Sequence, residues 1–274
     1  MNVEKVDLHM HSNASDGLLS PNELSLRAAE AGLAAFALTD HDTLDGLAKA
    51  AAAAKNYNIE FVPGVEISTE IEGREVHILG YYPLNKNDLN AALNDMKSER
   101  HVRMNKMLEA LHKLGFKIKM EDILLESGSA APGRLHLARL LLKKKYVHSL
   151  DEAFSVYLGR DKPAYVPRNY VQVEDVLNLL KNSGAVPVLA HPGVDGKYSL
   201  KKLVVLGLKG IEVFHPDHSP NLVRIYRQAA ENMGLVITGG SDYHGGELTP
   251  SSYSGKFAVE KYYLNRLKEC AGIT

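Results

Sequence analysis

Two histidines lie two residues apart near the start of the chain, in the segment Asp7-Leu8-His9-Met10-His11. The segment follows a short strand-like stretch. Because strand side chains alternate between faces, His9 and His11 are expected to point the same way. Imidazole nitrogens bind divalent transition metals, and nearby Asp16 adds an oxygen donor. A lone His-x-His pair is as often an ordinary surface or core feature as a metal site. The other residues of the chain must distinguish these two possibilities.

Further side chains that can bind metal recur along the chain. With His9 and His11, the set comprises Asp16, His41, Glu66, His77, His191, Asp242 and His244. They fall at the expected carboxyl ends of strands, apart from Asp16 in a loop and His77 inside its strand. Six imidazoles and three carboxylates exceed the four or so ligands of one zinc ion, so they could serve two or three ions. Recurrence at matching strand ends argues against chance.

Strands and helices alternate through most of the sequence, which favours a parallel α/β sheet with its site at the carboxyl ends of the strands. Ser20, Pro21 and Glu23 predict a capped helix start. Residues 72–74 predict a hairpin turn, and Asp42 and Asp45 are expected to cap the helix that follows them. Seven barrel-type strands are expected near Val6, Leu38, Val62, Ile78, Leu189, Val213 and Ile237.

The stretch 87–166 has a different character. A long helical pattern over residues 90–114 and further short helices predict a helical insertion that shapes the substrate pocket, while residues 1–86 and 167–274 form the barrel. Residues 96–145 carry twelve Lys or Arg residues and five Asp or Glu residues. Part of this excess is expected to be an ordinary solvated helix face. Positive charge is nevertheless concentrated in the insertion.

The bulk composition is that of an ordinary globular protein. The 274 residues are 45% hydrophobic and 24% charged, with a formal net charge of −1, which gives no reason to expect nonspecific nucleic-acid binding. A single cysteine, Cys270, excludes an internal disulfide and fits a reducing compartment. The sequence shows neither an apolar signal segment nor an apolar run of about 18 residues, so a cytoplasmic location is expected.

Four ordered blocks resemble the PHP (polymerase and histidinol phosphatase) family of metal-dependent phosphoesterases. The blocks are His9-Met10-His11, Thr39-Asp40-His41-Asp42, Ala190-His191-Pro192 and Gly240-Ser241-Asp242-Tyr243-His244. Glu66 and His77 fall at intervening family positions. The resemblance implies a distorted (β/α)7 barrel with a site for two or three metal ions.

Carried over residue by residue, the resemblance distributes the nine ligands among three ions. His9, His11, Glu66 and Asp242 would hold the first, Glu66, His77 and His191 the second, and Asp16, His41 and His244 the third. The positive charge of three divalent ions would exceed the negative charge of the three carboxylates and a bridging hydroxide. A site with excess positive charge suits a phosphate ester. The hydroxide would attack phosphorus in line. Mn²⁺ is the expected metal, with Fe and Zn²⁺ as alternatives.

The insertion supplies candidates for substrate binding. Arg100 and Arg103 lie three residues apart on a helix, and Arg134 and His136 follow a Pro-Gly turn, where an arginine could grip phosphate bidentately. His215 ends a strand without joining the nine ligands, so it could bind phosphate or protonate a leaving group. A similar Gly-Arg-x-His segment, and one like residues 162–166, occur in the stand-alone PHP subgroup that acts on nucleotides and short RNA.

The sequence therefore predicts a hydrolase of nucleoside 3′,5′-bisphosphates or short 5′-phosphorylated oligonucleotides. No membrane and no stable protein partner are implied. A histidinol-phosphate or other small-metabolite phosphatase remains an alternative, although the basic insertion argues against so small a substrate. A non-catalytic metal or nucleotide sensor is a second alternative, which the full ligand set disfavours. A polymerase-associated proofreading module is not expected, because the chain ends about thirty residues after the last motif.

Overall fold

The computed structural model describes residues 4–128, 130–169, 171–195, 199–246 and 257–273. Within these ranges, no helix combines the length and the apolar character that crossing a membrane requires.

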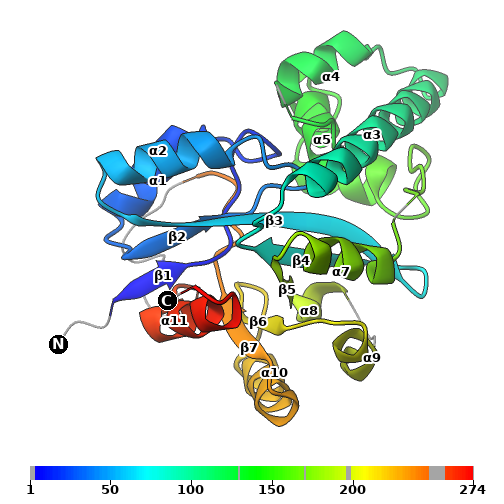
Figure 1. Ribbon diagram of the computed structural model, residues 1–274. Coiled ribbons are helices and arrows are strands. Elements are labelled where there is room, and N and C mark those ends of the chain that lie inside the picture. Colours follow the sequence, from blue (N-terminus) through cyan, green and yellow to red (C-terminus); the bar gives the residue numbers. More distant parts are fainter. Residues whose placement is uncertain (1–3, 129, 170, 196–198, 247–256, 274) are drawn as a thin grey trace.

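Eight strands form one sheet that curls into a barrel (Figure 1). The strands are β1 Lys5–Asp7, β2 Ala35–Leu38, β3 Glu60–Ile71, β4 Arg74–Tyr81, β5 Val186–Leu189, β6 Gly210–Phe214, β7 Val236–Gly239 and β8 Val259–Glu260. Their order in the sheet is β7-β6-β5-β4-β3-β2-β1-β8. All seven expected strands are present, and the predicted α/β barrel is confirmed. The two-residue β8, which pairs antiparallel with β1, was not predicted.

The sheet is mixed, which differs from the parallel sheet that the strand–helix alternation favoured. β3 and β4 form an antiparallel hairpin through Glu72 and Gly73, whose φ angles are 54° and 75°. β4 is also antiparallel to β5, while the pairs β1–β2, β2–β3, β5–β6 and β6–β7 are parallel. The reason is local. A two-residue turn reverses the direction of the chain and makes β4 antiparallel to β3, whereas a parallel pair of strands needs a long crossover connection.

The barrel closes through the segments that follow β1 and β7. The Leu8 N–H donates to the Gly239 carbonyl at 3.1 Å, and the His11 N–H donates to the Tyr243 carbonyl at 2.9 Å. Met10 and Tyr243 form an isolated parallel bridge. The first and last metal-ligand motifs are therefore held side by side by backbone hydrogen bonds.

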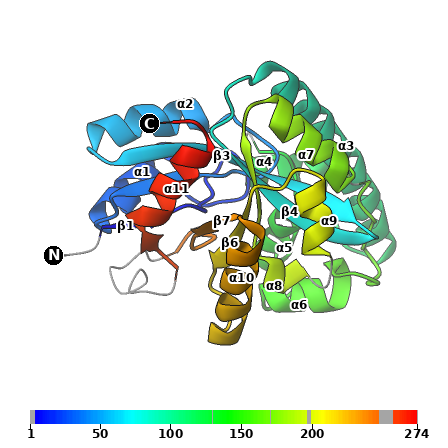
Figure 2. The same ribbon diagram turned by 60° about the horizontal axis from the view of Figure 1, so that its bottom comes forward.

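Helices surround this sheet. They are α1 Pro21–Glu30, α2 Leu47–Asn56, α3 Asn87–Lys113, α4 Met120–Ser127, α5 Arg134–Lys143, α6 Leu150–Glu152, the π-helix η1 Ala153–Leu158, α7 Val173–Asn182, α8 Pro192–Asp195, α9 Leu200–Val205, α10 Pro220–Met233 and α11 Lys261–Cys270. The capping box of Ser20 and Glu23 at the start of α1 is present as predicted. α11 packs against β7, β1 and β8 (Figure 2).

Two apolar layers stabilise the barrel. One fills its interior and includes Val6, Leu8, Val62 and Tyr81, all fully buried. The other lies between the sheet and the surrounding helices and includes Phe36. Burying one such large apolar side chain contributes roughly 1.5–3 kcal/mol. Together the layers fix the strand ends that carry the candidate ligands.

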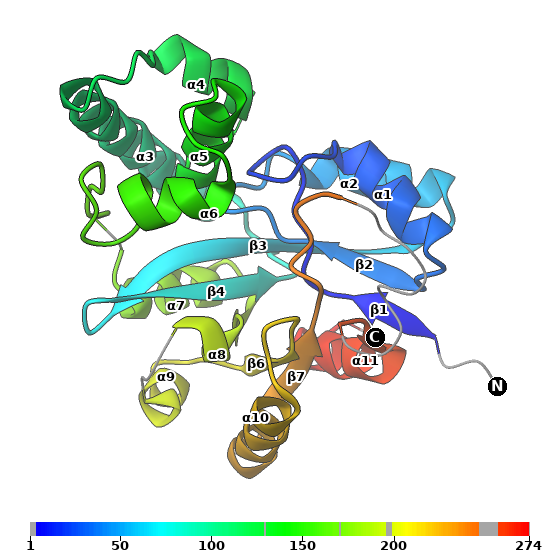
Figure 3. The ribbon, with the colours of Figure 1, turned by 180° about the vertical axis from the view of Figure 1, so that it is seen from behind.

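The helices α3 to α6 group together on one side of β3, away from α8 to α11 (Figure 3). They share a hydrophobic cluster of their own that includes Met104, Leu111 and Leu137. The first turns of α3 belong instead to the barrel, since Leu89 and Leu93 pack in the layer outside the sheet. α3 thus links both cores. The division of the chain at residues 87 and 166 stays a prediction.

Candidate metal centre and substrate cavity

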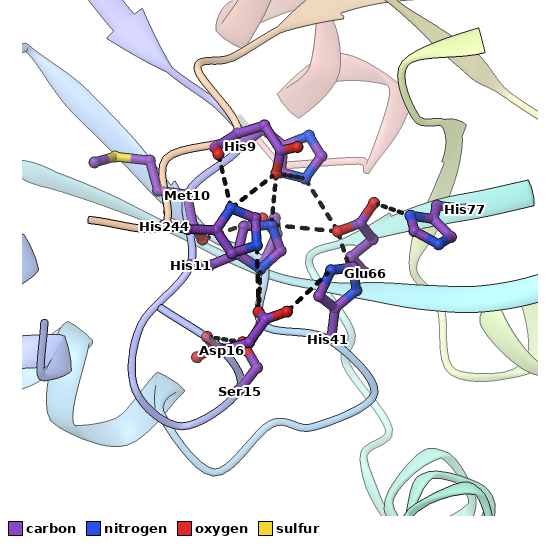
Figure 4. A network of polar contacts seen from close by, with 12 residues as sticks. His9, Met10, His11, Ser15, Asp16, His41, Glu66, His77 and His244 are labelled. Carbon is purple, nitrogen blue, oxygen red and sulfur yellow. Dashed lines mark hydrogen bonds and ion pairs between the residues drawn. The ribbon is translucent and has the colours of Figure 1, made fainter. Parts of the chain in front are cut away.

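Glu66, in the middle of β3, occupies the centre of the site (Figure 4). Its Oε1 lies 2.9 Å from His77 Nδ1 and 3.0 Å from His191 Nε2. Its Oε2 lies 3.2 Å from a ring nitrogen of each of His9, His11 and His41. Burial alone would raise the pKa of Glu66, but the surrounding histidines, His41 foremost, hold it well below its ordinary value. The carboxylate is therefore ionised and can bridge metal ions.

The two aspartates extend the cluster away from Glu66. Asp242 Oδ1 lies 3.0 Å from His11 Nε2 and 3.3 Å from His9 Nε2. Asp16 Oδ1 lies 3.2 Å from His244 Nε2, and its Oδ2 lies 4.0 Å from His41 Nε2. Every one of the nine predicted ligands thus lies within one contiguous cluster.

The donor atoms of this cluster fit divalent metal ions. Among the described residues, buried atoms without a hydrogen-bond partner include both ring nitrogens of His11, Nδ1 of His41, Oδ1 of Asp16 and Oδ1 of Asp242. His11 Nε2 approaches two carboxylate oxygens to within 3.2 Å yet makes no hydrogen bond. Leaving such atoms unsatisfied costs about 1–3 kcal/mol each. Metal ions between them would remove that cost.

Three groups of ligand atoms lie close enough together to hold an ion each. The groups are His9, His11, Glu66 and Asp242, then His11, Asp16, His41 and His244, and finally His41, Glu66 and His77. The first matches the predicted assignment, and the second contains the predicted Asp16, His41 and His244. The third has His41 where His191 was predicted, although His191 also contacts Glu66. The assignment of ligands to individual ions stays a prediction.

Burial and charge set opposite protonation states for two of the histidines. Burial lowers the pKa of His41 to about 3, so its ring is neutral and can bind metal. Burial also acts to lower the pKa of His11, but the carboxylates of Asp242 and Glu66 outweigh it and raise this pKa to about 10. A metal bound by His11 must therefore displace a proton.

Glu212, in β6, orients two of the ligands and was missed by the sequence reasoning. Its carboxylate accepts a hydrogen bond from His9 Nδ1 at 3.0 Å and from the His191 backbone N–H at 2.8 Å. Donation from Nδ1 leaves the His9 Nε2 lone pair facing Glu66 and Asp242, as a metal ligand needs. A charged residue between Ile211 and Val213, in an apolar strand, was the available signal.

Asp40 supports the loop that carries Asp16. It accepts hydrogen bonds from the Ser12 N–H at 2.7 Å, the Ser12 hydroxyl at 2.8 Å and the Ser15 hydroxyl at 2.7 Å. Burial raises the pKa of Asp40 to about 6, although these donors act to lower it. The carboxyl group is thus committed to fixing the loop between β1 and α1.

His215 lies beside the cluster but is engaged differently. Its Nδ1 accepts a hydrogen bond from the Asp217 backbone N–H at 3.2 Å, so in the neutral ring the proton is on Nε2. Nε2 is buried, without a hydrogen-bond partner among the described residues, and lies 3.6 Å from Asp242 Oδ2. His215 is consequently placed to donate a hydrogen bond from Nε2.

A cavity of about 180 Å³, called here the site cavity, opens next to the ligands. Its wall includes Asp16, His41 and His77 from the cluster and Arg100, Arg103, Arg134 and Arg168 from α3, α5 and the segment before α7. Arg103 Nε donates to the Val166 carbonyl at 2.8 Å, and Arg134 lies 3.4 Å from Glu75 Oε2. Ligands and arginines therefore face one space.

Asp42 does not cap α2, contrary to the expectation. The residue at the helix start is Gly46, with no side-chain cap, and Asp45 lies 3.5 Å from Lys97 instead. The Asp42 carboxylate contacts the guanidinium of Arg100 and that of Arg168, the latter at 2.6 Å. The two arginines, whose charges hold the pKa of Asp42 below its ordinary value against burial, outcompete a helix N-terminus as partners. Arg168 was not identified from sequence.

His136 is not among the residues that line the site cavity. It is 3% exposed, and its Nδ1 accepts a hydrogen bond from the Gly133 N–H at 3.1 Å, at the start of α5. The remaining candidates for substrate binding, Arg100, Arg103 and Arg134, do line this cavity.

Comparison with known proteins agrees with this geometry. The sequence matches the PHP domain family over residues 7–155. It is 34% identical over 251 residues to the 5′-3′ exoribonuclease of Haemophilus influenzae, covering 88% of this chain and 90% of the relative. It is 35% identical over 251 residues to the 3′,5′-nucleoside bisphosphate phosphatase of Chromobacterium violaceum, covering 88% of each.

A solved structure agrees along the whole chain. It is described as a candidate metal-dependent phosphoesterase from Bifidobacterium adolescentis, and it superposes with a TM-score of 0.90 at 26% identity. The match covers 100% of this chain and 98% of the other. The chain therefore belongs to the PHP domain family of metal-dependent phosphoesterases.

Proposed function

We propose that this protein hydrolyses phosphate esters of nucleotides, either nucleoside 3′,5′-bisphosphates or short 5′-phosphorylated oligoribonucleotides. The observation that carries the proposal is the site cavity, in which candidate metal ligands and four arginines share one wall. Guanidinium groups bind phosphate oxygens bidentately, and a second phosphate on the substrate gives these arginines a partner away from the reacting one. The activities after which the two relatives are named support this substrate class.

The nine clustered residues would hold two or three ions, with Mn²⁺ as the first choice and Fe or Zn²⁺ as alternatives. Bound divalent ions lower the pKa of a coordinated water to about 7, which supplies hydroxide at neutral pH, and they polarise the phosphoryl oxygens. A trinuclear centre is part of this proposal, and so is a cytoplasmic location, which the single cysteine supports.

The chain's own residues divide the remaining work. Arg100, Arg103, Arg134 and Arg168 bind and orient the phosphate groups of the substrate. His215, with its proton on Nε2, donates a hydrogen bond to the ester oxygen that leaves. Asp42 holds Arg100 and Arg168 at the cavity wall.

The test uses purified protein that is stripped of metal and reloaded with Mn²⁺. We expect phosphate release from adenosine 3′,5′-bisphosphate and shortening of a 5′-phosphorylated triribonucleotide. His41→Ala and Asp242→Ala should fall to background, because each removes a ligand of the centre. The exposed His148 provides the matched control, and His148→Ala should retain full activity. Metal-loaded protein that is inactive towards nucleotide, histidinol and sugar phosphates alike would contradict the proposal.

A further inference from the structure

A second cavity, of about 310 Å³, lies between α3 and α7 and adjoins the site cavity. We call it the α3–α7 pocket. Ser68, on β3, and Arg168 line both cavities, so these two residues form a wall that the cavities share. The pocket falls within the size range of about 300–1,000 Å³ that is common for small-molecule sites. The pocket therefore lies next to the place where a substrate would be held by its phosphates.

Four apolar side chains form part of the wall of the α3–α7 pocket. Ala92 and Met96 contribute from α3, Val171 from the segment before α7, and Leu179 from α7. These side chains offer surface for a flat or apolar group and no positive charge.

Carboxylates also line the pocket and make it unfavourable for anions. Asp95 and Glu99 lie one turn apart on α3, and Asp175 lies on α7, all three exposed. Each carboxylate accepts hydrogen bonds and repels anions. Among the described residues of the lining, Arg168 is the one cation, and it lies in the wall shared with the site cavity. The two neighbouring cavities thus have opposite charge, the site cavity suited to phosphate and the pocket to hydrogen-bond donors.

A nucleobase combines the features that this pocket selects. It has an apolar face, it is uncharged, and its edge carries N–H donors, most of all where an exocyclic amino group is present. The planar guanidinium of Arg168 can stack on the face of a base at the entrance. The pocket does not suit a further nucleotide of an oligonucleotide strand, because the phosphate of that nucleotide would meet the carboxylates of Asp95, Glu99 and Asp175.

We propose that the α3–α7 pocket binds the nucleobase of the substrate and favours adenine, guanine and cytosine over uracil. The reason for the preference is that the first three bases carry an exocyclic amino group that donates to the carboxylates, whereas uracil presents carbonyl oxygens in that place. The inference rests on the proposed function, since it names the part of the nucleotide that lies beyond the phosphates.

The first experiment fills the pocket. Ala92 lines it and is half-buried, whereas its neighbour Ala91 is exposed and lies outside the lining. For Ala92→Phe we expect KM for adenosine 3′,5′-bisphosphate to rise about tenfold, which corresponds to the loss of about one hydrogen bond to the base. KM for an abasic ribose 3,5-bisphosphate analogue should not change. Ala91→Phe should behave as the parent with both substrates.

The second experiment removes charge from the pocket. The parent should show kcat/KM for adenosine, guanosine and cytidine 3′,5′-bisphosphates about tenfold above that for the uridine compound. The double variant Asp95→Asn with Glu99→Gln should lose this preference. Glu109→Gln, an exposed site on the same helix outside the pocket, is the control and should keep it.

The outcomes separate the inference from the proposed function. Phosphate release that is equal for all four bases, or an Ala92→Phe defect that is the same with and without a base, overturns the inference and leaves the proposed function standing. An absence of turnover by the parent on every nucleotide overturns the proposed function, and the inference falls with it.

Discussion

The histidines of the site differ in which ring nitrogen the protein engages, and this difference assigns their roles. His9 donates from Nδ1 to Glu212, and His244 donates from Nδ1 to the Asp242 carbonyl at 2.8 Å. Both therefore keep a lone pair on Nε2, directed at carboxylates of the cluster. His215 accepts at Nδ1 and carries its proton on Nε2. The same side chain is thus suited to bind metal in one setting and to donate a hydrogen bond in the other.

Replacing His215 by Ala tests the donor role. We expect kcat for adenosine 3′,5′-bisphosphate to fall by about 10²–10³, the usual contribution of a hydrogen-bond donor to an oxygen that gains negative charge, while bound metal stays at the parent level. With p-nitrophenyl phosphate, whose leaving group needs no proton, the fall should be much smaller. Steady-state kinetics and metal analysis measure both. Equal losses on the two substrates, or loss of metal, would argue for a structural role instead.

His218 links β6 to α8 as a neutral histidine and predicts a pH effect on stability. Its Nδ1 donates to the Val213 carbonyl at 2.9 Å, and its Nε2 accepts from the Gly193 N–H at 3.2 Å. Burial lowers the pKa of His218 below its ordinary 6.5. The unfolded chain therefore binds the proton first, so this contribution to stability is present above about pH 6.5 and is lost as the pH falls.

The corresponding measurement compares the free energy of unfolding of metal-free parent, His218→Gln and His148→Gln between pH 8 and pH 5. We expect His218→Gln to be less stable than the parent at pH 8 and to lose less stability on acidification, because it has no ring to protonate. His148 is exposed, so His148→Gln should follow the parent. If His218→Gln follows the parent as well, His218 does not titrate in the predicted way.

Residue identities were recoverable from sequence only where they belonged to a spaced motif. The nine candidate ligands and three of the four arginines could be identified because imidazoles, carboxylates and a Gly-Arg turn recur at recognisable places. Glu212 and Arg168 could not, because each acts through a partner more than twenty residues away in sequence. Asp42 was misjudged because a carboxylate before a helix is usually a cap, and only the folded chain brings two guanidinium groups to it.

At the level of elements, the ends of the strands carry unusual backbone conformations. Asp42, His191 and Asp242 have φ angles of 52°, 23° and 52°, in the left-handed region that costs a residue other than glycine about 1–3 kcal/mol. Each follows a strand that ends at the site. The fold therefore accepts local backbone strain at two candidate ligands, His191 and Asp242, and at Asp42, which contacts Arg100 and Arg168.

Gly240, after β7, shows how closely the elements must approach. A Cβ at this position would lie 2.4 Å from both the Cβ and the backbone N of His9. For Gly240→Ala we expect a loss of about 1–3 kcal/mol in the free energy of unfolding and weaker metal binding, because the segment carrying Asp242 must move away from β1. Denaturant titration and chelator competition measure the two effects.

Gly133→Ala is the comparison for that variant, since its Cβ would meet Arg100 Nη1 at 3.6 Å, an ordinary contact. It should lose little stability and bind metal normally. Parent-like stability and metal affinity in Gly240→Ala would show that the two segments can separate without consequence.

Elements with local signals were predicted well. The start of α1 is confirmed because Ser20 and Glu23 form their capping box from neighbouring residues. The hairpin turn predicted at residues 72–74 is also confirmed, since Glu72 and Gly73 connect β3 to β4. The antiparallel pairing of β4 with β5 and the existence of β8 depend on long-range contacts, which periodicity does not encode.

At the scale of the whole molecule, the candidate ligands come from segments that lie far apart in the sequence. Ligands come from the β1–α1 segment, the β2 end, β3, β4 and the segments after β5 and β7. Metal bound to the folded state alone stabilises it by RT ln(1 + [L]/Kd), about 2.7 kcal/mol at a free concentration 100 times Kd. The helices α4 and α5 carry none of these ligands.

Chelation should therefore lower the melting temperature and loosen the molecule unevenly. We expect faster amide hydrogen exchange in residues 8–16 and 240–246, and unchanged exchange in α4 and α5, whose hydrophobic cluster is separate from the barrel layers. Calorimetry and hydrogen-exchange mass spectrometry before and after chelation provide the measurement. Uniformly faster exchange, or none, would contradict the view of the metals as local clamps.

The order of the ligands along the chain constrains how the protein is made. The group His41, Glu66 and His77 is contained in the first third of the sequence, but another needs His9 together with Asp242. At about 5–20 residues per second on the ribosome, Asp242 is added at least about 10 s after His9. Throughout that interval the segment after β1 also lacks its hydrogen-bond partners after β7. Barrel closure and assembly of that group are thus late events of biogenesis, so the metals available to the nearly finished chain decide what that group holds.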